Sequence, residues 1–229
     1  MLDQLKKDVY QANIDLVNYG LVTLTWGNVS GISRSEGLMV IKPSGVNYDK
    51  LKPADMVVVD MNGQVVESNF RPSSDTPTHI ELYKAFPDIG GIAHTHSMFA
   101  TIFAQACREI PCLGTTHADH FYGSIPVTRF LSEEEVETDY EKNTGKLIIE
   151  RFGGLDADSM PAVLIAGHAP FAWGKNAAEA VKNSLVLERV AQMAINTFQL
   201  NPDIESLPQH IISKHYKRKH GPNAYYGQK

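Results

Sequence analysis

One run of residues, 56–68, limits the fold more than any other part of the sequence, because it carries both arms of a turn. It reads "MVVVDMNGQVVES", with β-branched residues on either side of Asn62-Gly63. An Asn-Gly pair between two such runs is a strong signal of a β-hairpin. A further β-branched run precedes it, in "LMVIKPSG" at 38–45. The sequence therefore predicts a β-sheet.

Segments with helical periodicity alternate with these strands. Near the N-terminus, apolar residues recur at steps of three and four and end near Gly20, which predicts an amphipathic helix; they are Leu2, Leu5, Val9, Ala12 and Leu16. Strand "GGIAHTH" (90–96) lies between helical segments at 73–86 and 97–106, and 123–130 also has the pattern of a strand. A mainly exposed helix is expected at 132–152, and the longest one at 176–200. Without internal repeats or linkers, residues 1–229 are predicted to form a single α/β domain.

Composition excludes several classes of protein. With 43% hydrophobic and 21% charged residues, the chain has enough apolar side chains for an ordinary globular core. It contains no apolar run of the roughly 20 residues that span a bilayer, and its N-terminus lacks the apolar core of a signal peptide. A net charge of −5 does not suit a nucleic-acid partner. We therefore expect a cytoplasmic protein that binds neither membrane nor nucleic acid.

A pair of histidines ends the predicted strand at 90–96. Side chains at i and i+2 of a strand share a face, so the imidazoles of His94 and His96 emerge side by side. Asp75 stands at a predicted helix start, and His168 follows the strand "AVLIAG". Three imidazoles and a carboxylate suit zinc or another divalent transition metal. The alternative is a pair of core histidines hydrogen-bonded to backbone, and the other six histidines compete as ligands.

Two turns rich in small hydroxyl residues are candidates for binding phosphate. They are "KPSG" at 42–45 and "PSSD" at 72–75, and "WGNVSG" at 26–31 is a weaker third. Serine hydroxyls and exposed backbone N–H groups bind phosphate oxygens, and Lys42 would add positive charge. The alternative is a set of ordinary turns with a helix cap. The functional interpretation gains weight because the second turn contains the candidate ligand Asp75.

Two further residues have side chains that exchange protons. Asp119 lies between histidines in "GTTHADHFYG", and Tyr226 lies near the C-terminus in "NAYYGQ". A carboxylate and a phenol can serve as general base and general acid. Each also has a structural alternative, as a turn carboxylate and as an anchor for the tail.

Seven motifs, taken in order, closely resemble those of bacterial L-ribulose-5-phosphate 4-epimerases, in the class II aldolase/epimerase superfamily. They read "TLTWGNVSG", "VIKPSGV", "PSSDTPTH", "GGIAHTHS", "GTTHADHFYG", "PFAWGKNAAEAV" and "KHYKRKHGPNAYYGQ". The resemblance runs from Met1 to about Gln228. The resemblance implies an α/β fold with a central, mainly antiparallel sheet flanked by helices. It also implies a homotetramer with fourfold cyclic symmetry and active sites shared between adjacent subunits.

The resemblance assigns roles to individual residues. The zinc positions are matched by Asp75, His94, His96 and His168, and manganese or cobalt would be expected to substitute for zinc. The substrate and phosphate positions are matched by Gly27, Asn28, Ser44, Gly45, Ser73 and Ser74, with Lys42 beside them. Asp119 matches one acid/base residue and Tyr226 the other, the latter supplied by the neighbouring subunit. His215 and Glu141 match supporting positions.

One departure from the family pattern follows the third histidine. The family usually has glycine there, whereas this chain has Ala169. If the position requires a positive φ, the alanine would strain the turn by about 1 kcal/mol. A second departure is His120, where tyrosine is common.

The implied reaction inverts carbon 4 of L-ribulose 5-phosphate to give D-xylulose 5-phosphate. The distant ketone does not acidify the proton on carbon 4, so the bond between carbons 3 and 4 is expected to break and re-form. A zinc ion would act as the Lewis acid, and glycolaldehyde phosphate would rotate before re-addition. The alternatives are a class II sugar-phosphate aldolase (lyase), a zinc hydrolase and a non-catalytic metal-binding relative. In the aldolases a glutamate tends to replace Asp75, which favours the epimerase.

Overall fold

A single antiparallel sheet forms the centre of the protein. The computed structural model describes residues 2–226, and in it seven strands lie in the order β4-β3-β2-β1-β5-β7-β6. Every neighbouring pair is antiparallel. The strands are β1 (Asn28–Ser33), β2 (Leu38–Ile41), β3 (Val57–Asp60), β4 (Val65–Glu67), β5 (Gly91–His94), β6 (Ala162–Leu164) and β7 (Pro170–Gly174). The expected α/β class with an antiparallel sheet is confirmed.

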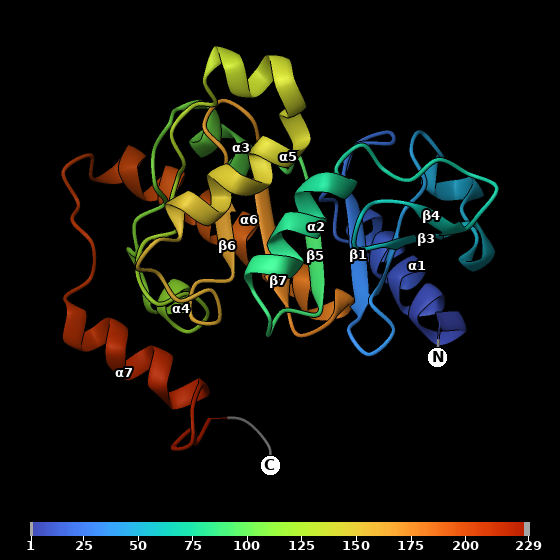
Figure 1. Cartoon of the computed structure of the whole chain (residues 1–229). Helices are drawn as coiled ribbons and strands as arrows, with labels where there is room; N and C mark the ends of the chain where they lie inside the picture. Colours follow the sequence, from blue (N-terminus) through green and yellow to red (C-terminus); the bar gives the residue numbers. More distant parts are fainter. Residues whose placement is uncertain (1, 227–229) are drawn as a thin grey trace.

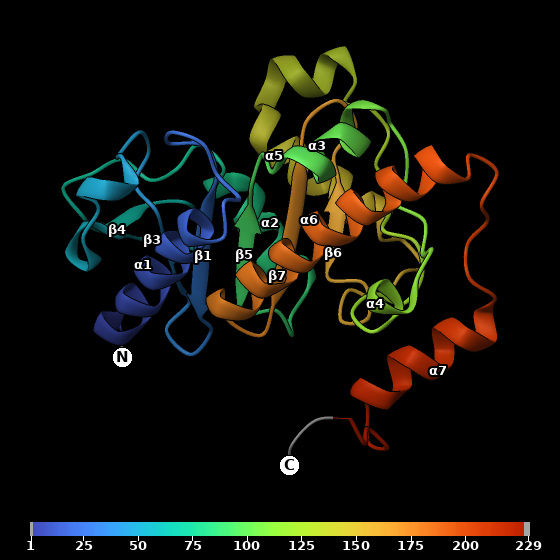
Figure 2. The same ribbon diagram turned by 180° about the vertical axis from the view of Figure 1, so that it is seen from behind.

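Helices cover both faces of this sheet. They are α1 (Leu2–Asn18), α2 (Thr76–Ala85), α3 (Met98–Gln105), α4 (Thr115–Ala118), α5 (Glu133–Arg151), α6 (Ala177–Leu200) and α7 (Gln209–Lys219), with short 3₁₀ turns at Tyr48–Lys50 and Pro53–Asp55. Helices α2 and α5 lie together on one face (Figure 1), and α1 and α6 lie on the other (Figure 2). None of the helices within residues 2–226 is long and apolar enough to cross a membrane.

The pleat of the strands explains why their sequences are apolar at consecutive positions. Val40, Val58 and Ala93 pack in the cluster that contains α1. Their neighbours Met39, Val59 and Ile92 pack in the cluster that contains α2. Because successive side chains of a strand point to opposite faces, a sheet covered on both faces needs apolar residues at every position. The hairpin at 56–68 forms as β3 and β4.

One predicted strand is absent. Residues 123–130 contain isolated bridges, from Ile125 to Ile110 and from Val127 to Leu164, and no ladder. Pro126, between the two bridging residues, has no backbone N–H to donate, which accounts for the interruption. The predicted helix at 132–152 forms as α5, but it is broken at Asp139, where the backbone is extended (φ −160°, ψ 74°).

Candidate active site

Three of the predicted metal ligands come together at the end of β5. His94 is the last residue of β5, His96 follows two residues later, and His168 lies in the turn before β7. Strands β5 and β7 pair with His94 opposite Phe171, so this turn lies over the end of β5. One ring nitrogen from each histidine lies within 4.8 Å of the others. The strand pairing therefore builds a three-histidine cluster from residues more than 70 positions apart.

The protonation states of these histidines suit metal binding. Nδ1 of His94 donates a hydrogen bond of 2.9 Å to the Pro170 carbonyl, which leaves its Nε2 without a proton. Burial lowers the pKa of His94 to about 3, with a further contribution from His96, and burial also lowers the pKa of His168 to about 4. Nδ1 of His168 is buried and has no hydrogen-bond partner within residues 2–226. Three neutral, converging imidazoles fit a zinc-type ion.

Asp75 lies beside this cluster and is not one of its converging ligands. It stands at the N-cap position of α2 but does not cap the helix through its side chain. Its Oδ2 instead accepts a hydrogen bond of 2.6 Å from Nδ2 of Asn28. Its charge acts on the histidines, since it opposes the lowering of the pKa values of His96 and His168 by burial. The structure therefore brings three of the four predicted ligands together, with Asp75 in the adjoining wall.

A cavity of about 590 Å³ joins the histidine cluster to the small-residue turns. Twelve of the predicted site residues line it: Gly27, Asn28, Lys42, Ser44, Gly45, Ser73, Ser74, Asp75, His94, His96, Glu141 and His168. The turns at 42–45 and 72–75 are joined by a bridge between Pro43 and Pro72, and the Ser44 amide donates to the Arg71 carbonyl. Two turns that are far apart in the sequence thus form one wall.

Lys42 is the cation of this wall. The residue is only 2% exposed, and its Nζ donates to the Pro43 carbonyl (3.3 Å) and lies 4.7 Å from the centre of the Tyr48 ring. No carboxylate within residues 2–226 forms an ion pair with it. Burial lowers the pKa of Lys42 to about 8. A buried ammonium without a carboxylate partner is suited to an anionic ligand.

Gly27 lets the backbone of the first turn approach the histidines. A Cβ at this position would lie 2.8 Å from the His94 carbonyl oxygen, and its φ is +79°. Both facts exclude a larger residue. The turn holds Asn28 at the start of β1, opposite His94 in the β1–β5 pairing.

Four residues that line the cavity were not among the predicted site residues: Thr25, Trp26, Pro43 and Tyr140. Thr25 and Trp26 belong to the turn before β1, and Tyr140 follows the break in α5. The Tyr140 ring centre lies 6.3 Å from that of His168. Burial, followed by the charges of Glu141 and Asp75, raises the pKa of Tyr140. Trp26 could have been predicted, because it stands in the motif "WGNVSG". The break that directs Tyr140 inward has no clear sequence signal.

Asp119, His215 and Tyr226 form a separate cluster outside the cavity. Asp119 accepts two hydrogen bonds from Arg218, at 2.9 and 2.6 Å, and one of 3.1 Å from Nδ1 of His215. Lys219 lies 3.3 Å from the same carboxylate, and the Arg218 guanidinium lies 4.8 Å from the centre of the Tyr226 ring. Burial alone would raise the pKa of Asp119, but the hydrogen bonds from Arg218, His215 and Lys219 lower it to about 2. We call Asp119, His215, Arg218, Lys219 and Tyr226 the Asp119 cluster.

The Asp119 cluster and the cavity lie at opposite ends of β7. His168 precedes the first residue of β7, whereas His120 and His220 line a cavity with Gly174 and Lys175, where β7 ends. Asp119 directly follows α4, and α7 carries His215 and Arg218. Figure 1 shows α4 and α7 at the lower end of the sheet, away from α3 and the upper part of α5. The chain thus brings Asp119 and Tyr226 near each other, but it does not bring either to its own cavity.

The expectation that Ala169 strains its turn is wrong. Ala169 is fully buried, and within residues 2–226 the only non-glycine residues with positive φ are Leu24 and Cys107. The left-handed position of this turn is taken by Gly167 instead, at φ +71°. Alanine therefore fits in the backbone that leads into β7, and its buried methyl group adds to the core.

Comparison with known proteins agrees with this geometry. Residues 7–195 match the Class II Aldolase and Adducin N-terminal domain family. An L-fuculose 1-phosphate aldolase structure is 26% identical, with a TM-score of 0.80 over 94% of this chain and 95% of that one. At lower identity the fold is shared with an L-fuculose-1-phosphate aldolase of Thermus thermophilus (22%, TM-score 0.70, 89% and 100% covered) and a sugar-phosphate aldolase of Thermotoga maritima (20%, 0.66, 90% and 98%). The chain belongs to the class II aldolase and adducin N-terminal domain family.

Proposed function

We propose that the protein is a zinc-dependent epimerase that converts L-ribulose 5-phosphate to D-xylulose 5-phosphate in the cytoplasm. The observation that carries the proposal is a single cavity that contains three neutral histidines and, in the adjoining wall, the buried cation of Lys42. Such a cavity can hold a phosphorylated sugar by both ends. The sequence resemblance selects the reaction from among those of the family.

Substrate binding is assigned to the residues of the turns. Lys42 would neutralise phosphate charge, and the hydroxyls of Ser44, Ser73 and Ser74 would donate hydrogen bonds to its oxygens. Gly27 and Gly45 let backbone groups approach the ligand without a side chain in between. Asn28 is fixed by its bond to Asp75 and would orient the sugar.

The metal would be held by His94, His96 and His168. When bound, a divalent ion supplies a Lewis acid for the negative charge that cleavage of the bond between carbons 3 and 4 leaves on the ketone fragment. Asp75 would add a negative charge beside the ligands. Its short side chain, already bonded to Asn28, is poorly placed to act as a base. This is the feature that favours epimerisation over an aldolase reaction.

Proton transfer is assigned to Asp119 and Tyr226. The hydroxyl proton on carbon 4 must be removed before cleavage, and a proton must return to the new alkoxide on the opposite side. Arg218 holds Asp119 ionised with a pKa of about 2, which makes the carboxylate itself a weak base. Asp119 is therefore suited to act through His215, which it orients, and Tyr226 is suited to donate a proton. Because the Asp119 cluster lies away from its own cavity, we assign both residues to the cavity of an adjacent subunit in a homotetramer with cyclic symmetry.

The second candidate is a class II aldolase that releases the aldehyde. The structural similarity to an L-fuculose 1-phosphate aldolase favours it, and the same residues would serve the cleavage step. A non-catalytic metal-binding relative is a third.

A proton NMR time course with L-ribulose 5-phosphate and zinc separates these candidates. The epimerase produces D-xylulose 5-phosphate without free fragments. An aldolase accumulates dihydroxyacetone and glycolaldehyde phosphate, which together account for the five carbons. An unchanged spectrum, with zinc and substrate shown to be bound, would refute both the epimerase and an aldolase that accepts this substrate.

A further inference from the structure

Helix α5 changes direction where it meets the cavity. Asp139, with extended backbone, divides it into a segment before the break (133–138) and a longer one after it (140–151). Tyr140 and Glu141, the first two residues after the break, line the cavity. A continuous helix would carry these two side chains in the direction set by the first segment. The break therefore determines what they face.

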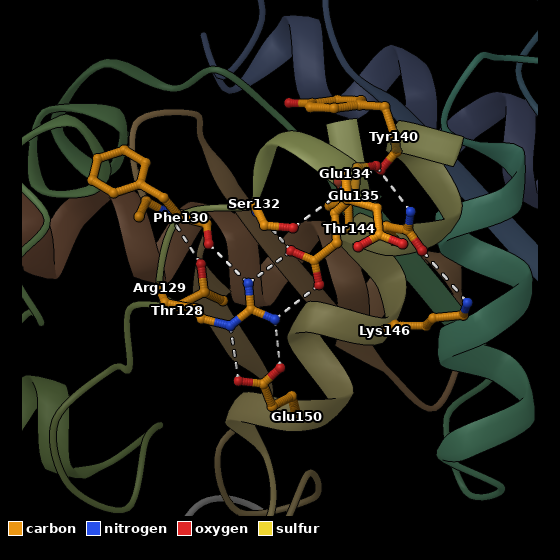
Figure 3. Close-up of polar contacts among 12 residues, drawn as sticks. Thr128, Arg129, Phe130, Ser132, Glu134, Glu135, Tyr140, Thr144, Lys146 and Glu150 are labelled. Carbon is orange, nitrogen blue, oxygen red and sulfur yellow. Dashed lines mark hydrogen bonds and ion pairs between the residues drawn. The ribbon is translucent and has the colours of Figure 1, made fainter. Parts of the chain in front are cut away.

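A three-residue ion cluster holds the two segments together. Arg129 donates to Glu135, in the segment before the break, at 2.8 and 2.9 Å, and to Glu150, in the segment after it, at 3.0 and 2.7 Å. Its fifth N–H bonds the Phe130 carbonyl at 2.9 Å, so the whole guanidinium is used. Figure 3 shows the fork between the two carboxylates. We call Arg129, Glu135 and Glu150 the Arg129 clamp.

Hydrogen bonds fix the backbone on both sides of the break. Asn143 Nδ2 donates to the Glu135 carbonyl (2.9 Å) and to Thr138 Oγ1 (3.1 Å), which spans the break. Thr144 Oγ1 donates to the Tyr140 carbonyl at 2.8 Å. From α2, Thr78 Oγ1 donates to the Glu141 carbonyl at 2.5 Å. Tyr140 therefore projects from a backbone that is held by its own helix and by α2.

The Tyr140 side chain extends from this backbone into the cavity. Its ring lies near His168, and Figure 3 shows it apart from the Arg129 clamp, with no interaction drawn between them. Its hydroxyl forms no hydrogen bond to any residue in the described part of the chain. An aromatic ring with a free polar tip is suited to the face and hydroxyl groups of a sugar. Because Lys42 and the serines are assigned to the phosphate group, Tyr140 is available to contact the unphosphorylated part of the sugar.

We propose that Tyr140 is a substrate-contact residue that donates a hydrogen bond to a sugar hydroxyl beside the histidine cluster, and that Arg129 is a positioning residue acting through the break at Asp139. This inference rests on the proposed function, since it takes the ligand of the cavity to be a sugar phosphate. It predicts that the two residues affect sugar binding and leave metal binding unchanged.

The first test uses Tyr140→Phe, which removes only the hydroxyl. In zinc-loaded protein, calorimetry with L-ribulose 5-phosphate should show a loss of affinity of roughly 3- to 10-fold, the value of one neutral hydrogen bond. Cobalt binding, followed by its visible absorption, should not change. Tyr19→Phe, at an exposed tyrosine at the end of α1, is the matched control and should leave both unchanged. An affinity for the sugar phosphate equal to that of wild type overturns the assignment of Tyr140.

The second test uses Arg129→Ala, with Arg189→Ala on the exposed side of α6 as control. Hydrogen exchange should become faster in 133–145, and sugar affinity should fall at least as far as in Tyr140→Phe. If Arg129 acts through Tyr140, adding Tyr140→Phe to Arg129→Ala should cause little further loss. Additive losses, or faster exchange with unchanged affinity, would make the clamp a purely structural feature.

These outcomes can be separated from failure of the proposed function. Wild-type protein that neither binds nor converts a sugar phosphate refutes the proposed function, and the role of Tyr140 falls with it. Wild-type protein that binds the sugar phosphate while Tyr140→Phe binds it equally well refutes only the role of Tyr140.

Discussion

The side chain of Asn28 donates a hydrogen bond of 2.6 Å to the carboxylate of Asp75, which joins the first residue of β1 to the N-cap of α2. This bond holds Asp75 in the wall of the cavity, beside the three histidines whose ligand atoms converge. The metal site should therefore survive the loss of the Asp75 charge, but not the loss of a histidine.

Asp75→Asn and His168→Ala separate these two contributions. We expect Asp75→Asn, which can keep a hydrogen bond to Asn28, to weaken zinc binding by no more than roughly 10- to 100-fold, the usual effect of a neighbouring group. His168→Ala should prevent stoichiometric binding. Elemental analysis after dialysis against trace zinc measures both. Equal loss of metal in the two variants would make Asp75 a ligand of the same rank as the histidines.

Removal of metal should stop turnover. The histidine cluster predicts about one divalent ion per chain, and zinc, manganese or cobalt should restore part of the activity after chelation, because all three bind imidazole. Activity and metal content are measured on the same samples. Full activity in protein shown to be free of metal would contradict the role of the cluster.

Lys42 should have opposite effects on stability and on binding. Burial lowers its pKa to about 8 from 10.5, so between these pH values the unfolded chain binds more protons and stability rises with pH. Phosphate binding requires the charged form, so affinity should fall above about pH 8. Lys42→Met should raise the melting temperature at pH 7 while weakening substrate binding and removing this pH dependence. Thermal unfolding and calorimetry across pH 6 to 10 test both effects. A Lys42→Met protein less stable than wild type would contradict the desolvation argument.

Mixed oligomers test whether the active site is shared. His96→Ala damages the cavity, and Asp119→Asn damages the cluster at the other end of β7. If each cavity uses the cluster of an adjacent subunit, random mixing in equal amounts should make about a quarter of the sites intact. Asp119→Asn mixed with Tyr226→Phe is the matched control. Because both residues contact Arg218 in one chain, no site should recover. Native mass spectrometry confirms exchange, and recovery in the control would mean that the two residues serve different subunits.

Ala169→Gly should lower the stability of the protein, because there is no strained turn for glycine to relax. Ala169 is fully buried and does not have a positive φ, so glycine would remove a packed methyl group and add backbone freedom to the unfolded chain. Together these effects cost about 1 to 2 kcal/mol. Denaturant unfolding measures the change. Equal or higher stability would restore the idea of a strained turn.

The strand pattern and the histidines could be predicted because their signals are local. An Asn-Gly turn between β-branched runs specifies a hairpin, and the spacing of His94 and His96 specifies a shared face. The strand predicted at 123–130 failed because Pro126 stops the ladder.

Other features depend on contacts between distant segments. That His168 reaches His94 follows from the pairing of β5 with β7, which single-sequence periodicity does not contain. That Tyr140 faces the cavity follows from the break at Asp139, which requires Arg129 and Asn143 to bridge two parts of α5. The distance of the Asp119 cluster from the cavity is also a property of the tertiary fold. The family resemblance suggests a role for Asp119, but it does not give the position of Asp119 within the subunit.

The placement of the cavity and the Asp119 cluster at opposite ends of β7 has a consequence for how activity would depend on concentration. Under the proposed sharing, a lone subunit carries parts of two different sites and no complete one. Dilution below the dissociation constant of the assembly would then abolish catalysis while every subunit stayed folded and kept its metal. Specific activity would rise with protein concentration until the rings were complete.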